Sequence, residues 1–259
     1  MSSELRTERR ESILLLTISD PPTRNALSDQ VYAAGIEALG TAEADTQIRA
    51  LVLQGEGAHF CSGGDVRRLA LRRGAERAVG ARTIERFHEF VEALGAFPKP
   101  VLAAVEGAAA GAGFSLALAC DLIVAADDAR FSMAYARVGL SPDGGGAWQL
   151  AHALPRQLVA ELLWLAEPLP ARRLHELGVV NRLAAPGHAR DVALEIAARL
   201  AACAPNAVAS AKELLRAAAR RTLGDHMAAE RDHFLDNLFH ANGGEGLAAF
   251  LGKRAPRFR

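Results

Sequence analysis

The sequence predicts an α/β fold, and three observations support this prediction. Apolar runs of strand length recur along the first half of the 259-residue chain, and two of them lead into glycine-rich turns at 59–65 and 107–113. Helical stretches follow, so that a strand–turn–helix unit repeats up to about residue 180. From about residue 188 the sequence is helical almost throughout. We therefore expect an α/β core over 1–187 and a C-terminal helical region over 188–259.

The first elements follow from apolar pattern and capping residues. Residues 13–19 form an apolar run that predicts a buried strand, closed by an Asp-Pro-Pro sequence. Residues 28–43 are predicted to be helical, with Ser28 as the N-cap. Residues 50–54 predict a second strand, and Asp65 is placed to cap the short helix after the first glycine-rich turn.

The next helix is predicted by apolar residues at helical spacing, and a Phe-Pro-Lys-Pro sequence over 97–100 ends it. Residues 100–105 predict a third strand, which leads into the second glycine-rich turn and an alanine-rich helix that ends near Ala119. Residues 121–126 predict a fourth strand. The apolar stripe of the first of these helices consists of Ile84, Phe87, Val91, Leu94 and Phe97.

The helices predicted after residue 188 carry apolar stripes of their own. Breaks between them fall near Pro205, at 223–224 and at 242–244. These stripes need a partner surface, either on the core or on another subunit. The stripes consist of Leu194, Ile196, Leu200, Leu214, Leu215, Phe234, Leu235, Leu238 and Phe239.

Composition favours a globular protein and excludes several function classes. Half of the residues are hydrophobic, 23% are charged and the formal net charge is zero, so neither nucleic acid nor an anionic membrane surface is an expected partner. No apolar run reaches the roughly 18–20 residues of a membrane span. Residues 1–10 lack the apolar stretch of a secretory signal. Cys61, Cys120 and Cys203 are odd in number and widely spaced, which predicts reduced thiols and a cytoplasmic location.

A third glycine-rich turn, at 140–146, is the most informative segment because it carries a carboxylate, Asp143. Peptide N–H groups at strand-to-helix turns point outward without partners. Two of them from separate turns are able to hold a developing oxyanion while Asp143 moves a proton beside it. Taken singly, each turn also fits a tight connection, and Asp143 fits an Asx turn. A nucleotide site is disfavoured, because 107–113 does not supply G-x-G-x-x-G and the chain has no P-loop pattern.

Taken together, the three turns and their flanks resemble the crotonase superfamily of enoyl-CoA hydratases and isomerases. The resemblance covers almost the whole chain, and several spaced motifs in the right order are far more specific than any one of them. The matching segments are 20–27 (DPPTRNAL), 60–65 (FCSGGD), 99–107 (KPVLAAVEG), 119–125 (ACDLIVA), 131–146 and 246–254 (GLAAFLGKR).

The resemblance implies a crotonase-like ββα spiral core that binds an acyl-CoA thioester. It also implies a C-terminal helical trimerisation region, and thus a homotrimer or a dimer of trimers. The oxyanion hole would use the backbone N–H groups of Gly64 and Ala112, where alanine replaces the usual glycine but keeps the N–H. CoA would enter as part of the substrate, and the resemblance implies no other cofactor and no metal.

The acid/base residues depart from the hydratase pattern of this superfamily. Typical hydratases use two glutamates to hold and activate water, and those positions match Ser115 and Tyr135 here. Asp143 lies where the Δ3,Δ2-enoyl-CoA isomerase branch places a glutamate and the ring-1,2-epoxyphenylacetyl-CoA isomerase branch an aspartate. Residues 131–143 look particularly like the latter branch. The apolar neighbours expected to bury Asp143 in part, and so to raise its pKa, are Val138, Leu140 and Trp148.

Further positions match substrate contacts of the family. Arg67 matches a cationic contact to CoA, and a solvated helix charge is the alternative. Ser115 and Tyr135 either orient substrate or water, or fill the space of the missing glutamates. Phe250 and Lys253 match C-terminal residues that approach CoA, sometimes across a subunit boundary. The substrate-binding set that the resemblance implies is Ala26, Leu27, Ser62, Asp65, Val66, Arg67, Ser115, Tyr135, Phe250 and Lys253.

We therefore expect an acyl-CoA isomerase that uses an oxyanion hole and one carboxylate to shift or rearrange unsaturation. The alternatives are a hydratase or related lyase with a remodelled acid/base set, and a family member that binds acyl-CoA without catalysis. Cys61 is expected to pack, since no histidine accompanies it in its motif. His226, His233 and His240 lie seven apart, but no carboxylate or cysteine pattern completes a metal site with them.

Overall fold

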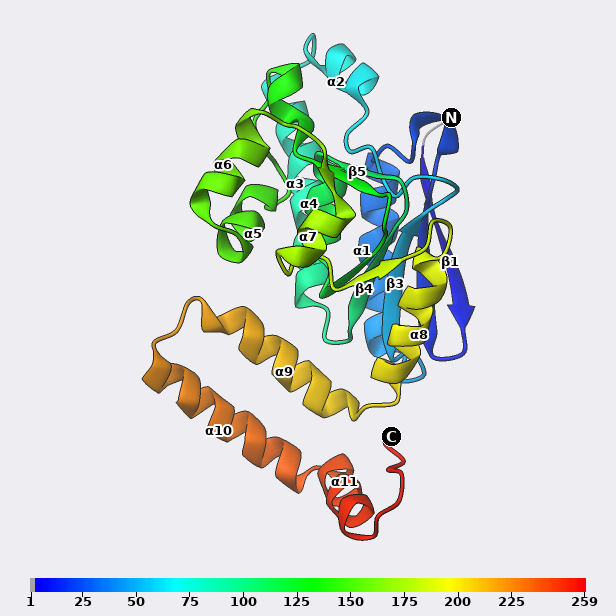
Figure 1. Cartoon of the computed structure of the whole chain (residues 1–259), viewed down its shortest axis with the longest axis vertical. Helices are drawn as coiled ribbons and strands as arrows, with labels where there is room; N and C mark the ends of the chain where they lie inside the picture. The colour runs from blue at the N-terminus through cyan, green and yellow to red at the C-terminus, as the bar shows by residue number, and fades with distance from the viewer. Residues whose placement is uncertain (1–2) are drawn as a thin grey trace.

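A six-stranded sheet forms the centre of the protein in a computed structural model, which describes residues 3–259 (Figure 1). Its first two strands pair antiparallel, and all later neighbours in the sheet are parallel. In spatial order the strands are β1 (Glu4–Arg10), β2 (Ile13–Ser19), β3 (Ala50–Gly55), β4 (Val101–Val105), β6 (Leu122–Ala126) and β9 (Arg182–Ala184).

A second sheet has three short strands, of which the first follows β4, the second follows β6 and the third follows α6. β5 (Ala108–Ala110) pairs in parallel with β7 (Arg130–Ser132), and β8 (Leu169–Pro170) pairs antiparallel with β7. A helix follows each of the first two, α4 (Ala112–Leu118) after β5 and the 3-10 helix η2 (Ala134–Val138) after β7. Two strands and a helix thus form the repeating unit, which confirms the predicted ββα spiral.

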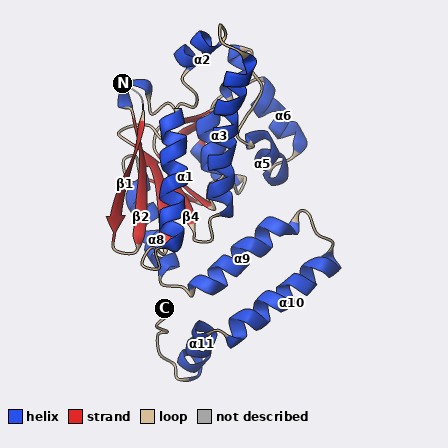
Figure 2. Ribbon diagram, turned by 180° about the vertical axis from the view of Figure 1, so that it is seen from behind, coloured by secondary structure: helices blue, strands red, loops and turns tan. Residues whose placement is uncertain are grey.

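Helices cover both faces of the larger sheet. α8 lies across one face in Figure 1, while α1 and α3 lie side by side on the other face in Figure 2. The remaining helices are η1 (Pro21–Thr23), α1 (Asp29–Ala44), α2 (Val66–Arg72), α3 (Arg77–Ala96), α5 (Gly146–Ala153), α6 (Arg156–Trp164), α7 (Ala171–Glu176), α8 (Ala189–Ala201), α9 (Pro205–Ala218), α10 (Leu223–Phe239) and α11 (Ala241–Leu251).

The side chains of the parallel strands alternate between two apolar layers, as the period of a strand requires. Leu51 and Leu53 of β3 belong to the layer beneath α1 and α3, whereas Val52 between them belongs to the layer beneath α8. α8 contributes three buried alanines at intervals of four residues, Ala189, Ala193 and Ala197, to that second layer. Residues four apart share one helix face, so these small side chains let α8 pack closely on the sheet.

The last three helices, α9 to α11, extend away from the sheet and lie at the opposite end of the molecule from α2 (Figures 1 and 2). α8 belongs to the predicted region 188–259, yet it packs on the core. The boundary at 187/188 and the trimerisation region stay predictions. Large apolar side chains that α9 to α11 leave exposed are Leu215, Leu223, Met227, Phe234, Leu235, Leu238, Phe239, Leu247, Phe250 and Leu251.

All four predicted strands are present, as is the helix over 28–43, in which the Ser28 hydroxyl accepts a hydrogen bond from the Val31 N–H at 3.4 Å. Asp65 caps α2 as predicted, accepting from the N–H groups of Arg67 and Arg68. The sequence analysis missed β1, β5, β7, β8 and β9. No single helix among residues 3–259 has the length and apolarity of a membrane span, although α8 and α9 meet that criterion as a pair bent by 109°.

Candidate active site

All three glycine-rich segments border one cavity of about 460 Å³. The first contributes Gly64, the second Ala112 and the third Asp143, and the walls between them come from the first turns of α1, from α2 and from α3. The cavity therefore gathers the three features that the sequence analysis placed in a single site.

Backbone hydrogen bonds fasten the first two turns together. The Cys61 N–H donates to the Ala108 carbonyl at 3.0 Å, and the Ala110 N–H donates back to the Cys61 carbonyl at 2.9 Å. Gly63 has a φ of +89°, and a Cβ there would lie 2.6 Å from the Ala110 oxygen and 3.2 Å from the Ala112 nitrogen. Only glycine fits so close a crossing of two segments of the chain, and this crossing sets the Gly64 peptide beside the start of α4.

Two backbone donors are available where the turns meet. Ala112 is the first residue of α4, so its N–H has no acceptor within the helix. Within residues 3–259, neither the Ala112 N–H nor the Gly64 N–H donates a hydrogen bond to another protein group. Both residues line the cavity. Two unpaired donors, one of them at the positive end of a helix, suit a carbonyl oxygen that gains negative charge.

Asp143 is held across the cavity by two side chains. The Tyr135 hydroxyl donates to Asp143 Oδ1 at 2.5 Å, and the Ser115 hydroxyl donates to the Asp143 backbone carbonyl at 3.0 Å. The next residue, Gly144, has a φ of +59°, and a Cβ there would lie 2.3 Å from the Phe87 ring. The turn after Asp143 is therefore pressed against α3, and glycine is required for that approach.

Burial raises the pKa of the Asp143 carboxyl above its ordinary value, and the Tyr135 hydrogen bond lowers it in part. The direction of this pKa shift agrees with the sequence analysis, but one of the three side chains expected to bury Asp143 does not do so. Val138 and Leu140 line the cavity, whereas Trp148 is 53% exposed and packs on His152 outside it. Trp148 points away because it lies on the outer side of α5.

Tyr135 and Ser115, whose roles the sequence left open, both position Asp143. Burial and the Asp143 charge raise the pKa of Tyr135, so its phenol keeps the proton that it donates. Ser115 is fully buried and does not line the cavity. These two side chains therefore hold one aspartate in place.

Replacing Tyr135 with phenylalanine is expected to move the acid limb of the pH profile of kcat/KM to higher pH. A carboxylate acts as a base only when ionised, so activity that depends on Asp143 as a base is expected to fall as the pH drops through its pKa. The Tyr135 hydroxyl stabilises the ionised form, and its removal takes away the largest influence that opposes the rise in pKa caused by burial. Ser115→Ala is the matched control, because Ser115 contacts the backbone of Asp143 and should leave the limb in place. An acid limb that stays put in Tyr135→Phe, or moves to lower pH, would contradict this assignment.

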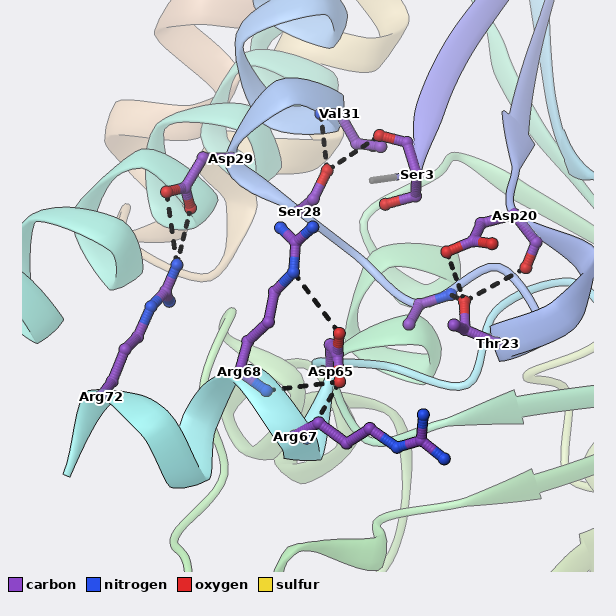
Figure 3. Close-up of polar contacts among 11 residues, drawn as sticks. Ser3, Asp20, Thr23, Ser28, Asp29, Val31, Asp65, Arg67, Arg68 and Arg72 are labelled. Atoms are coloured by element: carbon purple, nitrogen blue, oxygen red, sulfur yellow. Dashed lines mark hydrogen bonds and ion pairs between the residues drawn. The ribbon is translucent and has the colours of Figure 1, made fainter. Parts of the chain in front are cut away.

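Most of the predicted substrate-binding residues of the first turn border the cavity. Leu27, Ser62, Asp65 and Val66 line it, and Ala26 is buried beside it without lining it. Arg67 does not line the cavity, and Figure 3 shows its side chain pointing away from Arg68 and Arg72, which do. Arg68 and Arg72 share a helix face because they lie four residues apart, whereas Arg67 lies on another face of α2.

The predicted C-terminal contacts do not reach this cavity within one chain. Phe250 is 82% exposed on α11, and Lys253 follows that helix. α11 lies at the far end of the molecule from α2 (Figure 1). A contact of Phe250 or Lys253 with CoA thus requires a second subunit, as the resemblance allows, and it stays a prediction.

Several cavity residues were missed by the sequence analysis. Tyr32 of α1, Arg72 of α2 and His88 of α3 line it, as does Phe87, which the helical spacing had assigned to the core. Ile84, expected in the same core stripe, is 44% exposed and also faces the cavity. No motif marks these residues, because only the packing of α1, α2 and α3 brings them together.

The alternative chemistries weighed for cysteine and histidine have no support in the site. Cys61 is fully buried, and burial raises the pKa of its thiol to about 12, so it packs as predicted. His226 pairs with Glu230, His233 contacts Ser210 and Glu213, and His240 caps α11. Among residues 3–259 no group of three or more potential metal ligands is found.

Comparison with known proteins identifies the family. Residues 8–259 match the family model for enoyl-CoA hydratase/isomerase. The chain is 34% identical to the 1,2-epoxyphenylacetyl-CoA isomerase of Escherichia coli over 96% of this chain and 95% of that protein. It is also 32% identical to the 2,3-dehydroadipyl-CoA hydratase of the same organism over 99% of both.

A solved structure shares the fold closely. The crystal structure of an enoyl-CoA hydratase from Polaromonas sp. JS666 is 54% identical to this chain, with a TM-score of 0.98 over 99% of this chain and all of that one. Relatives of this similarity carry both hydratase and isomerase names, so they fix the family and leave the reaction open. The chain belongs to the enoyl-CoA hydratase/isomerase family of the crotonase superfamily, whose substrates are acyl-CoA thioesters.

Proposed function

We propose that this protein is an acyl-CoA isomerase that moves a carbon–carbon double bond within a CoA thioester. The observation that carries the proposal is how the acidic residues that line the cavity are paired. Three acidic residues line it: Asp29 pairs with Arg72, and Asp65 caps α2 and pairs with Arg68. Asp143 makes no ion pair within residues 3–259, although nearby His88 helps to lower its pKa. One carboxylate is thus free to act as a base, and one is what an isomerase needs.

The proposed reaction uses Asp143 twice. The thioester carbonyl accepts hydrogen bonds from the Gly64 and Ala112 N–H groups, which acidifies the protons on the adjacent carbon. Asp143 removes a proton from C2 of a 3-enoyl thioester, and the electrons pass into a dienolate held by the two donors. The protonated Asp143 then returns that proton to C4, and the double bond lies between C2 and C3. CoA takes part only as a portion of the substrate, and the proposal calls for no other cofactor.

The raised pKa of Asp143 suits both halves of this transfer. A carboxylate whose pKa is raised by burial is a stronger base than a solvated one, and it is still a competent acid after it takes the proton. Tyr135 and Ser115 fix its position so that the same oxygen can serve two carbons.

Hydration of a 2-enoyl thioester is the second candidate, because the 54% identical crystal structure is described as an enoyl-CoA hydratase. It requires that water be held and activated. The typical pair of glutamates is replaced here by Ser115 and Tyr135, and both of these donate hydrogen bonds to Asp143. We therefore propose isomerisation as the first candidate function. Hydration and related lyase chemistry come second, and binding of acyl-CoA without catalysis comes third.

Rates measured on thioesters of the same acyl chain length distinguish these reactions. Conversion of 3-enoyl to 2-enoyl thioester and hydration of the 2-enoyl thioester are to be followed separately on one chain length, with an aryl-epoxide thioester as a third substrate. We expect isomerisation of an enoyl or aryl-epoxide thioester to be faster. If hydration of the simple 2-enoyl thioester dominates by tenfold or more in kcat/KM, about 1.4 kcal/mol of transition-state preference, the isomerase proposal is wrong.

We also propose that the protein assembles as a homotrimer or a dimer of trimers. The exposed apolar side chains of α9 to α11 support this, because a single chain leaves them uncovered. A cytoplasmic location stays a prediction from the sequence.

A further inference from the structure

Tyr32 presents an unpaired hydroxyl to the cavity that the proposed transfer does not use. The residue is only 6% exposed, yet it lines the cavity, and its hydroxyl makes no hydrogen bond to any group among residues 3–259. Its ring packs on Phe87, with centroids 5.2 Å apart, which fixes where the hydroxyl points. The hydroxyl is not among the fully buried polar atoms without a partner, so it is accessible from the cavity and free to donate to a ligand there.

Arg72 lines the same cavity, and some of its N–H groups have no acceptor among residues 3–259. Its Nη2 contacts both carboxylate oxygens of Asp29 at 3.3 and 3.4 Å, as Figure 3 shows. In the described part of the chain, its Nε and Nη1 atoms make no hydrogen bond. The arginine side chain is 28% exposed, so it is largely desolvated and held by Asp29. A guanidinium fixed in this way can donate to a further acceptor.

Arg72 lies away from the first glycine-rich turn, whereas Tyr32 lies close enough to both Arg72 and Asp143 for their charges to act on its hydroxyl. Arg72 ends α2, seven residues after Asp65, which corresponds to roughly 10 Å along the helix from the first glycine-rich turn. The cavity wall includes the apolar side chains of Leu69, which lies on α2 between Asp65 and Arg72, and of Ile84 and Leu140. An acyl group that starts at the two backbone donors therefore crosses apolar surface before it meets Arg72.

Both groups are donors at neutral pH. Burial raises the pKa of Tyr32 well above its ordinary value, so the phenol stays protonated, and the guanidinium stays charged. Asp29 balances the arginine charge and uses one of its nitrogens. The ligand group that completes the set is thus an oxygen that accepts hydrogen bonds.

We propose that Tyr32 and Arg72 form a specificity subsite for an acceptor oxygen on the acyl group of the thioester. A carboxylate and a neutral ether or carbonyl oxygen share this chemistry. A wholly hydrocarbon acyl group would cover the Tyr32 hydroxyl and the free arginine nitrogens without replacing their hydrogen bonds to water, so it should bind less well. The subsite deepens the isomerase proposal, because it names the substrate class of the same cavity.

Binding of saturated thioesters tests the subsite apart from the reaction, since they can be neither isomerised nor hydrated. Hexanoyl- and octanoyl-CoA are to be compared by calorimetry with analogues of the same length that end in a methoxy group or a carboxylate. We expect at least one oxygenated thioester to bind wild-type protein five- to tenfold more tightly than its hydrocarbon twin, the effect of one or two hydrogen bonds. Preference for the carboxylate alone identifies an anionic group, and equal preference identifies a neutral acceptor.

Tyr32→Phe should lower the ratio of the two affinities, oxygenated over hydrocarbon thioester, by a factor of three or more. Its affinity for the hydrocarbon thioester should be unchanged. Because the lost hydroxyl has no protein partner, the Tm of this variant should stay level or rise, which a structural role would not produce. Arg72→Gln should remove most of the remaining preference. Equal or weaker binding of every oxygenated thioester to wild-type protein overturns the proposal, as does a preference that survives Tyr32→Phe. Dominant hydration with an intact binding preference would count against the isomerase proposal alone.

Discussion

Replacing Asp143 with asparagine is expected to lower turnover of a 3-enoyl thioester by about 10²–10⁴-fold, the range for losing a general base. Asparagine cannot take up the proton from C2, and no other cavity carboxylate replaces it. Asp29 and Asp65 are both held by arginines. The backbone donors at Gly64 and Ala112 are unchanged, so binding of a saturated thioester should persist.

The fold should also persist, because asparagine keeps the contacts that position this residue. Its amide oxygen can accept from the Tyr135 hydroxyl, and the backbone carbonyl still accepts from Ser115. The folded protein raises the Asp143 pKa, so it binds the proton more tightly than the unfolded chain does. Stability therefore falls as the pH rises through this pKa, and the ionised carboxylate is a cost at pH 7.

Asparagine removes that cost, so the Tm of the variant at pH 7 should exceed that of wild-type protein. The gain should shrink as the pH falls and wild-type Asp143 becomes protonated. Thermal melts at several pH values, together with single-turnover rates, measure both effects. Near-wild-type turnover of the best substrate would remove Asp143 from the mechanism, and a large fall in Tm would assign it a structural role.

The strands that could be predicted from sequence are those with a continuous apolar run. β2, β3, β4 and β6 lie inside the sheet with both faces covered, so nearly every residue is apolar. β1 could not be found in this way, because almost every residue of Glu4–Arg10 is exposed and its main tie to the sheet is its pairing with β2 as an edge strand. β5, β7, β8 and β9 have two or three residues each, too few for any period to appear.

The residues of the site also divide into those that the sequence predicts and those that it does not. Gly64, Ala112 and Asp143 lie in turns whose glycines are visible in the sequence, because close backbone crossings such as that at Gly63 exclude side chains. Tyr32 and Arg72 lie within ordinary helices and carry no local signal. Their place at the cavity depends on how α1 and α2 pack, and the sequence pattern contains no information about that packing.

Replacing Gly64 with proline is expected to lower kcat by about 10²–10³-fold, the cost of losing one oxyanion donor. Proline has no N–H, so the thioester oxygen would keep only the Ala112 donor. The φ of Gly64 lies outside the left-handed region, so the residue has no backbone need for glycine. The space is also open, since a Cβ there would meet only the Leu69 side chain at 3.6 Å.

Gly64→Ala is the matched control, because it adds that Cβ and keeps the N–H. If the donor matters, the alanine variant should retain most of the wild-type rate while the proline variant loses it, with similar Tm values for the two. The loss should fall mainly on kcat, since the oxyanion forms only as the reaction proceeds and the ground-state carbonyl is a weaker acceptor. A folded proline variant with the rate of the alanine variant would show that the Gly64 N–H does not stabilise the intermediate. Equal losses in both variants would instead assign the effect to the shape of the turn.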